Sequence, residues 1–269
     1  MTYELLAHLD VHYGHGRERD RLADGAGALE RDRTRALIAA RLPAPPAAVV
    51  DVGGAAGVYA RWLADLGYAV MLVDRYPPHV AQAREESSRG RPFAAAVADA
   101  RRLPLVDGSA DVVLLLGPLY HLTEPADRLT ALVEARRVLR PGGLLAAAAI
   151  NRHASLLDGV FRRLLEQPGF PAVVDKALAT GRHEPPAGAD WLTRAYFHLP
   201  DELRDEVASA GFHDVDVMGV EGPGGWASDL AERRADPAAW QQVLDAAART
   251  ERDPATIAMS AHLLALAST

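Results

Sequence analysis

Between residues 48 and 150, apolar runs alternate with helical segments, and this alternation constrains the fold more than any other feature of the chain. The runs lack the apolar–polar alternation of a half-exposed sheet, so each strand should be buried on both faces. The five predicted strands are Ala48–Val52, Ala69–Val73, Phe93–Ala98, Asp111–Leu116 and Leu144–Ile150. Helical segments between parallel strands form crossover connections, which are right-handed in nearly all folds. The pattern therefore predicts an α/β fold with a doubly wound, mostly parallel sheet.

Beyond residue 150 the rhythm changes. Ser155–Glu166 and Pro171–Ala179 have helical, amphipathic spacing, so we expect a helical insertion at about residues 151–198, after the fifth strand. The alternation then resumes with strands at Phe212–Val220 and Ser260–Ala267, which would complete a seven-stranded sheet. For Ser260–Ala267 the pattern also allows a helix.

A proline-rich joint at Leu42–Ala48 separates a charged N-terminal stretch from the first strand. Proline is unfavourable in helix interiors and in central strands, so the joint marks a boundary. We expect residues 1–42 to form an N-terminal helical lid and residues 43–269 to form one domain that includes the insertion.

Composition excludes several classes of function. The formal net charge of −7 disfavours a large nucleic-acid interface, which usually needs a basic face. The chain has no cysteine, which excludes disulfides, thiolate metal sites and a cysteine nucleophile. The N-terminus lacks a secretory pattern, and the longest apolar run, Leu144–Ile150, is far shorter than the roughly 20 residues that span a bilayer. We expect a cytoplasmic protein, a monomer or a homodimer, that binds neither nucleic acid nor membrane.

The first strand ends in a glycine-rich segment, Asp51–Gly57 (DVGGAAG), that opens the next helix. Small residues let the backbone approach a ligand closely, and the helix N-terminus offers free N–H groups. The second and third strands end at Asp74 and Asp99, at the sheet edge where doubly wound folds bind their ligands. A carboxylate at Asp74 can accept both hydroxyls of a ribose, and one at Asp99 can accept from an adenine amino group.

These elements resemble those of the class I S-adenosylmethionine-dependent methyltransferases. Asp51–Gly57 is similar to the family's acid-x-Gly-x-Gly-x-Gly element, and Val97–Ala100 (VADA) to its acid beside adenine. Leu139–Leu144 (LRPGGL) is similar to the family's turn before the fifth strand. Ala55 departs from the pattern, because the family most often has glycine there, and its side chain narrows the room beside the cofactor. The likeness is strong over residues 48–150 and loose from there to the end of the chain.

The resemblance implies a Rossmann-like fold, S-adenosyl-L-methionine as methyl donor and S-adenosyl-L-homocysteine as product. It places Asp51 at the amino end of the cofactor and Asp74 at its ribose. The remaining residues of the implied cofactor site are Gly53, Gly54, Ala55, Gly57, Arg75, Asp99, Ala100 and Leu116. The implied reaction is an in-line displacement that moves the methyl group to an oxygen or nitrogen of a small metabolite. Because sulfur leaves as a neutral thioether, positioning can supply most of the catalysis.

Two other functions fit parts of the pattern. A nicotinamide dinucleotide site needs Gly-x-Gly-x-x-Gly. Neither Gly53 nor Gly54 starts that spacing, because the later positions hold alanine, valine and tyrosine. A non-catalytic binding or scaffold protein could keep the same fold, but the retained strand-end aspartates argue against loss of the cofactor site.

The acceptor is expected near the loop after the fourth strand and near the end of the insertion. Tyr120 and His121 follow the fourth strand, and His121 is the candidate base, since imidazole titrates near neutrality. Tyr196 and His198 are candidate acceptor contacts at the end of the insertion. The competing interpretation of these residues is a plain turn in the first case and core packing in the second.

In the predicted lid, Tyr13 and Arg21 are expected to contact the carboxylate of the cofactor or the acceptor. His8 and His12 lie one helical turn apart, which would suit a metal pair. No nearby carboxylate completes such a site, so no metal is expected.

Overall fold

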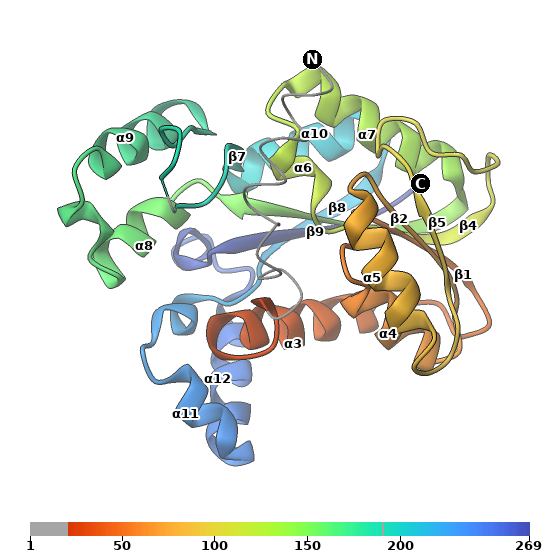
Figure 1. The fold of residues 1–269 in the computed structure, drawn as a ribbon, viewed down its shortest axis with the longest axis horizontal. Helices are drawn as coiled ribbons and strands as arrows, with labels where there is room; N and C mark the ends of the chain where they lie inside the picture. Colours follow the sequence, from red (N-terminus) through yellow and green to blue (C-terminus); the bar gives the residue numbers. More distant parts are fainter. Residues whose placement is uncertain (1–20, 190) are drawn as a thin grey trace.

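The structure, a computed structural model, describes residues 21–189 and 191–269, and Figure 1 shows a central sheet with helices on both faces. The strands are β1 (Ala48–Val52), β2 (Ala69–Asp74), β3 (Ala94–Val97), β4 (Ala110–Leu115), β5 (Leu139–Asn151), β6 (Arg182–His183), β7 (Ala195–His198), β8 (His213–Gly219) and β9 (His262–Ser268). The α-helices are α3 (Gly25–Ala39), α4 (Val58–Asp65), α5 (Pro77–Ser87), α6 (Pro118–His121), α7 (Pro125–Val138), α8 (Ala154–Phe161), α9 (Phe170–Thr180), α10 (Pro200–Ser209), α11 (Leu230–Ala235) and α12 (Pro237–Thr250). Short 3-10 helices are η1 (Leu164–Glu166), η2 (Pro223–Trp226) and η3 (Ile257–Met259).

Seven strands run in the order β3-β2-β1-β4-β5-β9-β8. In the described part of the chain the sheet has nine strands and not the predicted seven, because the β6–β7 hairpin joins it at β5. Strands β1 to β5 are parallel to one another, and β9 lies antiparallel between β5 and β8. This order confirms the predicted doubly wound, mostly parallel sheet of the Rossmann-like kind within the described chain. The segment Ser260–Ala267, for which the pattern allowed strand or helix, contributes strand β9.

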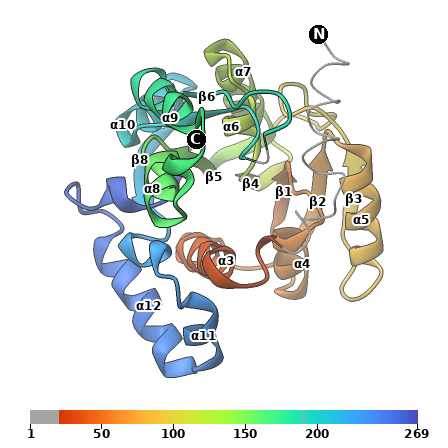
Figure 2. The ribbon, with the colours of Figure 1, turned by 60° about the vertical axis from the view of Figure 1, so that its left-hand side comes forward.

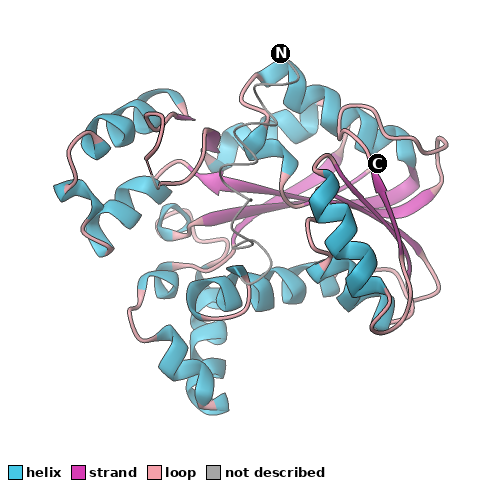
Figure 3. Cartoon of the chain, in the orientation of Figure 1, coloured by secondary structure: helices cyan, strands magenta, loops and turns pink. Residues whose placement is uncertain are grey.

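Two helical layers bury the faces of the sheet, as Figure 3 shows by the helices above and below the strands. Helices α3, α4 and α5 pack on one face, and α6, α7 and α10 on the other. Because successive side chains of a strand point to opposite faces, β1 gives Val49 to the first layer and Val50 to the second. Both side chains are buried, which explains why the strands read as continuously apolar.

The insertion after β5 is only partly helical, so the prediction of a purely helical segment was incomplete. It contains α8, η1 and α9, and then the short antiparallel hairpin β6–β7. Strand β7 pairs with the end of β5 through Ile150–Phe197 and Asn151–His198, beyond the last pairing of β5 with β4. Figures 1 and 2 show α8 and α9 on the opposite side of the molecule from α5.

The start of β5 differs from the sequence-based expectation, and the contacts of α3 were not part of it. The predicted turn Arg140–Gly143 is the irregular start of β5, where the pairing with β4 shifts register. Helix α3 packs on α11 and α12 through Ala28, Leu29 and Trp240.

Residues 1–20 lie outside the described residues, so the predicted lid boundary at residue 42 stays a prediction. No helix in the described ranges combines the length and the apolarity needed to cross a bilayer.

Candidate functional site

The glycine-rich loop joins β1 to α4 in a conformation that needs glycine. Gly53 and Gly57 have φ angles of +73° and +91°. A Cβ atom on Gly53 would lie 2.7 Å from Cδ of Pro118, and one on Gly57 would lie 3.0 Å from the ring of Phe93. Ala55 also has a positive φ, of +46°, a conformation that favours glycine. The loop backbone is therefore held in a shape that leaves no room for larger side chains at Gly53.

Asp51 is fully buried on β1 beneath this loop, and neither carboxylate oxygen has a hydrogen-bond partner among the described residues. A Cβ atom on Gly54 would lie 2.6 Å from its Oδ2 atom. Burial, and then the neighbouring charge of Asp74, raise the pKa of Asp51 to about 7, although the N–H of Ala60 acts in the opposite direction. Buried acceptors without partners are rare. A ligand ammonium group beside the loop would supply the missing donors, so the residues present fit the amino end of the expected cofactor.

Asp51 should make the unliganded protein lose stability as the pH rises. Its pKa is raised from an ordinary value of 3.8 to about 7, so the folded state binds the proton more tightly than the unfolded chain does. Its stabilising contribution is present below pH 4 and is lost as the pH rises through 7. Each pKa unit corresponds to about 1.4 kcal/mol, so Asp51→Asn should raise the free energy of unfolding at pH 8 by up to about 4 kcal/mol. Urea titrations of both proteins between pH 4 and 8 measure the difference, and a difference that does not change with pH would contradict the shift.

Asp74 ends β2 and faces the glycine loop. Its Oδ2 accepts from the backbone N–H of Ala55 at 3.0 Å, and Oδ1 accepts from that of Tyr76 at 2.8 Å. The side chain of His79 is also close, with Nδ1 3.4 Å from Oδ2. A carboxylate can accept about four hydrogen bonds, so capacity remains for ribose hydroxyls. The structure thus places Asp74 against the loop, and its role at the ribose stays a prediction.

Asp99 lies after β3, where Arg101 holds it in a two-pronged ion pair. Arg101 donates from Nε to Oδ1 at 3.0 Å and from Nη2 to Oδ2 at 2.7 Å. Burial would raise the pKa of Asp99, but the hydrogen bonds and charge of Arg101 outweigh it, with a smaller contribution from Arg75, and lower that pKa. Ala100, beside Asp99, is half-buried. Because Oδ2 accepts only one of these bonds, it can still accept from an adenine amino group.

The loop after β4 lies against the insertion. Leu116 is half-buried and packs with the α4 side of the core. Tyr120 and His121 are on the short helix α6, with ring centres 4.7 Å apart, and both side chains are half-buried. Tyr120 packs against a small apolar cluster that includes Ala195 and Phe197 of β7. Both residues therefore lie at the carboxyl end of β4, next to the insertion.

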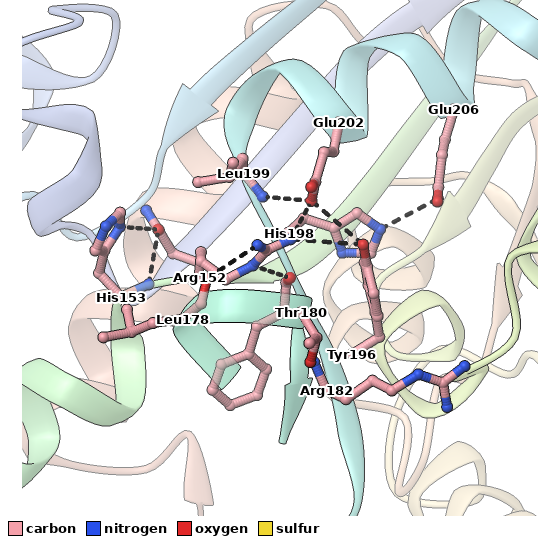
Figure 4. A network of polar contacts seen from close by, with 12 residues as sticks. Arg152, His153, Leu178, Thr180, Arg182, Tyr196, His198, Leu199, Glu202 and Glu206 are labelled. Carbon is pink, nitrogen blue, oxygen red and sulfur yellow. Dashed lines mark hydrogen bonds and ion pairs between the residues drawn. The ribbon is translucent and has the colours of Figure 1, made fainter. Parts of the chain in front are cut away.

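Tyr196 and His198 belong to a polar network that joins the insertion to α10, shown in Figure 4. His198 is fully buried, and its Nε2 lies 3.1 Å from Oε2 of Glu206. The guanidinium of Arg128 lies 3.8 Å from the centre of the Tyr196 ring and also bonds Glu206. Tyr196 and His198 share one side of β7, and Phe197 points to the other. Of these three residues of β7, Phe197 lines a cavity.

This cavity has a volume of about 1160 Å³ and lies between α3, the insertion and the turn after β8. Ligand pockets usually measure about 300–1,000 Å³, so the space can hold a drug-sized molecule. Ile150, at the carboxyl end of β5, forms part of its wall. The aromatic and imidazole rings in the cavity wall are those of Phe170, His183, Trp191, Phe197, Trp226 and His262. Among the predicted site residues in the described ranges, Arg21 lines the cavity. The glycine loop, the three strand-end aspartates and the four predicted acceptor contacts do not line it; these contacts are Tyr120, His121, Tyr196 and His198. Tyr13, His8 and His12 lie outside the described ranges.

Three residues that the sequence did not single out meet at the wall of this cavity: Glu30, Glu221 and His262. Nδ1 of His262 lies 2.5 Å from Oε1 of Glu221 and 3.8 Å from Oε2 of Glu30. Burial would lower the pKa of His262, but the charges of Glu30 and Glu221 outweigh it and raise that pKa to about 9. Arg21 donates two hydrogen bonds to Glu30. The imidazolium and this guanidinium therefore already balance both carboxylates, without a divalent cation.

Comparisons with known proteins identify relatives of this chain. A family described as a methyltransferase domain matches residues 50–147, from β1 to β5. A malonyl-[acyl-carrier protein] O-methyltransferase of Geobacter sulfurreducens is 36% identical over 175 residues, which cover 64% of this chain and only 58% of that protein. A ubiquinone/menaquinone biosynthesis C-methyltransferase of Acidiphilium cryptum is 30% identical over 194 residues, which cover 70% of this chain and 75% of that protein.

The fold is similar to that of a SAM-dependent methyltransferase from Methanosarcina mazei. The TM-score is 0.59 at 18% identity, and the match covers 87% of this chain and 96% of that one. At this identity the similarity concerns the fold alone.

Proposed function

Because the chain belongs to the class I S-adenosylmethionine-dependent methyltransferases, we propose that it methylates an oxygen or nitrogen atom of a small molecule bound in the cavity beside α3 and the insertion. The observation that carries the proposal is the position of this cavity. Ile150 in its wall is the last residue but one of β5. Strand β5 neighbours β4, which in turn neighbours the strand that carries the glycine loop. A donor at the loop and an acceptor in the cavity would therefore share one edge of the sheet.

The residues at the loop would bind and orient the donor. Asp51 would take the ammonium group, Asp74 the ribose hydroxyls and Asp99 the adenine amino group. When bound, S-adenosylmethionine supplies a methyl group on a positively charged sulfur. The chain then has to hold the acceptor atom in line with that methyl carbon and exclude water, and the aromatic wall around Phe197 supports both tasks.

Asp74→Ala should weaken binding of S-adenosylhomocysteine by about 10- to 150-fold, the usual cost of losing a hydrogen bond to a charged group. Isothermal calorimetry measures the affinity. Asp111→Ala is a matched control, because Asp111 also accepts a backbone N–H, from Ala48 at 2.7 Å, at the opposite edge of the sheet. Equal affinities of the two variants would refute the ribose assignment.

The activity itself is tested with S-adenosylmethionine that carries an isotopically labelled methyl group. The protein is incubated with a panel of phenols, carboxylic acids and amines, and mass spectrometry detects labelled products. The proposal expects a labelled small molecule together with S-adenosylhomocysteine. A chain that binds S-adenosylhomocysteine and labels no member of the panel would favour the scaffold function instead.

A further inference from the structure

His262 and Glu221 form a pair at the cavity wall, in which Glu221 contacts one of the two imidazole nitrogens. His262 begins β9 and pairs with Ile150 of β5, so it lies at the edge of the sheet that carries the strand ends. Its side chain lines the cavity and is 23% exposed. Nδ1 is taken by Glu221, and within the described ranges Nε2 has no hydrogen-bond partner. A carboxylate on one ring nitrogen orients the imidazole and presents the other nitrogen to a ligand.

Glu221 is fixed in this position. It is 2% exposed, and its Oε2 accepts from the hydroxyl of Ser260 at 2.8 Å and from the backbone N–H of His262 at 3.0 Å. Its Oε1 is 2.5 Å from Nδ1 of His262. Both oxygens are therefore satisfied, so Glu221 orients His262 and is not itself free to bind a ligand.

The other charged groups around the pair are also matched. Glu30 on α3 is bonded by Arg21, and Arg33 on the same helix pairs with Glu251 at 2.5 Å. Arg33 also donates to the carbonyl of Val220, next to Glu221. With these pairs made, the Nε2–H of the imidazolium is the positive group of the cluster that remains for a ligand.

We propose that the Glu221–His262 pair binds an ionisable oxygen of the methyl acceptor, and that this oxygen is the phenolic hydroxyl of an aromatic small molecule. The inference rests on the proposed function and deepens it. On binding, the O–H bond breaks and its proton goes to Nε2 of a neutral imidazole, or to water when Nε2 already carries a proton. In both cases the bound state is a phenolate beside an imidazolium.

The rest of the cavity wall suits an aromatic ring. Phe197 stacks on His183 with ring centres 4.9 Å apart, and Trp191 and Trp226 also line the space. Burial lowers the pKa of His183 to about 4, so this ring is neutral at physiological pH and belongs to the apolar wall. The imidazolium of His262 thus shares the cavity with these aromatic faces, while Asp158, Arg162, Glu184 and Arg194 supply charged side chains elsewhere in the wall. An aromatic ring that carries one anionic oxygen matches this combination of flat rings and a positive group.

The test compares two probes that differ only at the oxygen, 4-nitrophenol and 4-nitroanisole, on protein saturated with S-adenosylhomocysteine. Calorimetry should show that the wild type binds 4-nitrophenol at least about tenfold more tightly, since a hydrogen bond to a charged group is lost in the ether. The visible absorbance of the phenolate should also rise on binding. His262→Gln and Glu221→Gln should remove the preference. His213→Gln should keep it, because His213 is exposed at the start of β8, paired with the far end of β9.

The comparison of the two probes on the wild-type protein needs no variant. It therefore tests the inference even when His262→Gln does not fold. Equal or undetectable binding of the two probes by the wild type would overturn the inference. So would a preference that survives in His262→Gln, or zinc binding in calorimetry that requires Glu30, Glu221 and His262 together. Loss of S-adenosylhomocysteine binding by the wild type would count against the proposed function instead, because that step precedes the addition of either probe.

Discussion

Gly53→Val is expected to abolish binding of S-adenosylhomocysteine. Gly53 has a φ of +73°, a conformation that costs a β-branched residue about 1–3 kcal/mol. Its Cβ atom would also lie 2.7 Å from Cδ of Pro118, so the loop, the start of α6 or both must move. These are the elements proposed to approach the cofactor, and calorimetry should detect no binding.

Gly108→Val is the matched control for this change. Gly108 has a similar φ of +59°, but a Cβ atom there would meet nothing within 4 Å. It should suffer comparable backbone strain and bind S-adenosylhomocysteine normally. Far-UV circular dichroism must be native for both variants. Normal binding by Gly53→Val would mean that the ligand lies elsewhere.

For an amine acceptor, which has to lose a proton, His121→Ala is expected to lower turnover by about 10²–10⁴-fold, the usual contribution of a general base, with nearly unchanged affinity for S-adenosylhomocysteine. A phenol that ionises on binding beside His262 does not need this base. We propose His121 as this base because α6 places it at the carboxyl end of β4, beside the insertion. The measurement is turnover against pH for the wild type and the variant, with an acceptor found in the labelled-methyl screen. His213→Ala serves as the control histidine.

Superimposable pH profiles of wild type and His121→Ala would remove the base role. If His121 only shapes the pocket, the Michaelis constant should rise while turnover falls little. His262 is proposed to bind the acceptor. Its substitution should therefore change the affinity for the acceptor more than the rate of the chemical step.

The sequence was most informative where the structure depends on local features. Strand β1 has the predicted bounds, and β4 differs from Asp111–Leu116 by one residue at each end. An apolar run bounded by small or acidic residues encodes both the burial of a strand and the point at which it ends. For the same reason Asp51 and Asp74 could be placed around the glycine loop before the fold was known.

Features that depend on distant segments were not predictable in the same way. Strand β6 is only Arg182–His183, and its hairpin exists because β7 extends the end of β5. Alternation predicts that Tyr196 and His198 share a side of β7, but only the packed fold shows that this side faces α10 and that Phe197 faces the cavity.

The Glu30–Glu221–His262 cluster is the clearest case of this limit. Its members come from α3, the turn after β8 and the start of β9, and no local spacing links them. The one available signal was that Glu221 follows a strand and His262 begins the antiparallel partner of that strand. In such a pair the end of one strand lies beside the start of the other, so both side chains reach the same sheet edge.

Calorimetric titration of the wild-type protein with S-adenosylhomocysteine and with NADPH tests the assigned cofactor site most directly, with Gly53→Val and Asp74→Ala measured alongside. The assigned site predicts saturable binding of S-adenosylhomocysteine by the wild type, much weaker binding by Asp74→Ala, none by Gly53→Val, and no binding of NADPH. Binding of NADPH in place of S-adenosylhomocysteine, or wild-type affinity for S-adenosylhomocysteine in both variants, would contradict it.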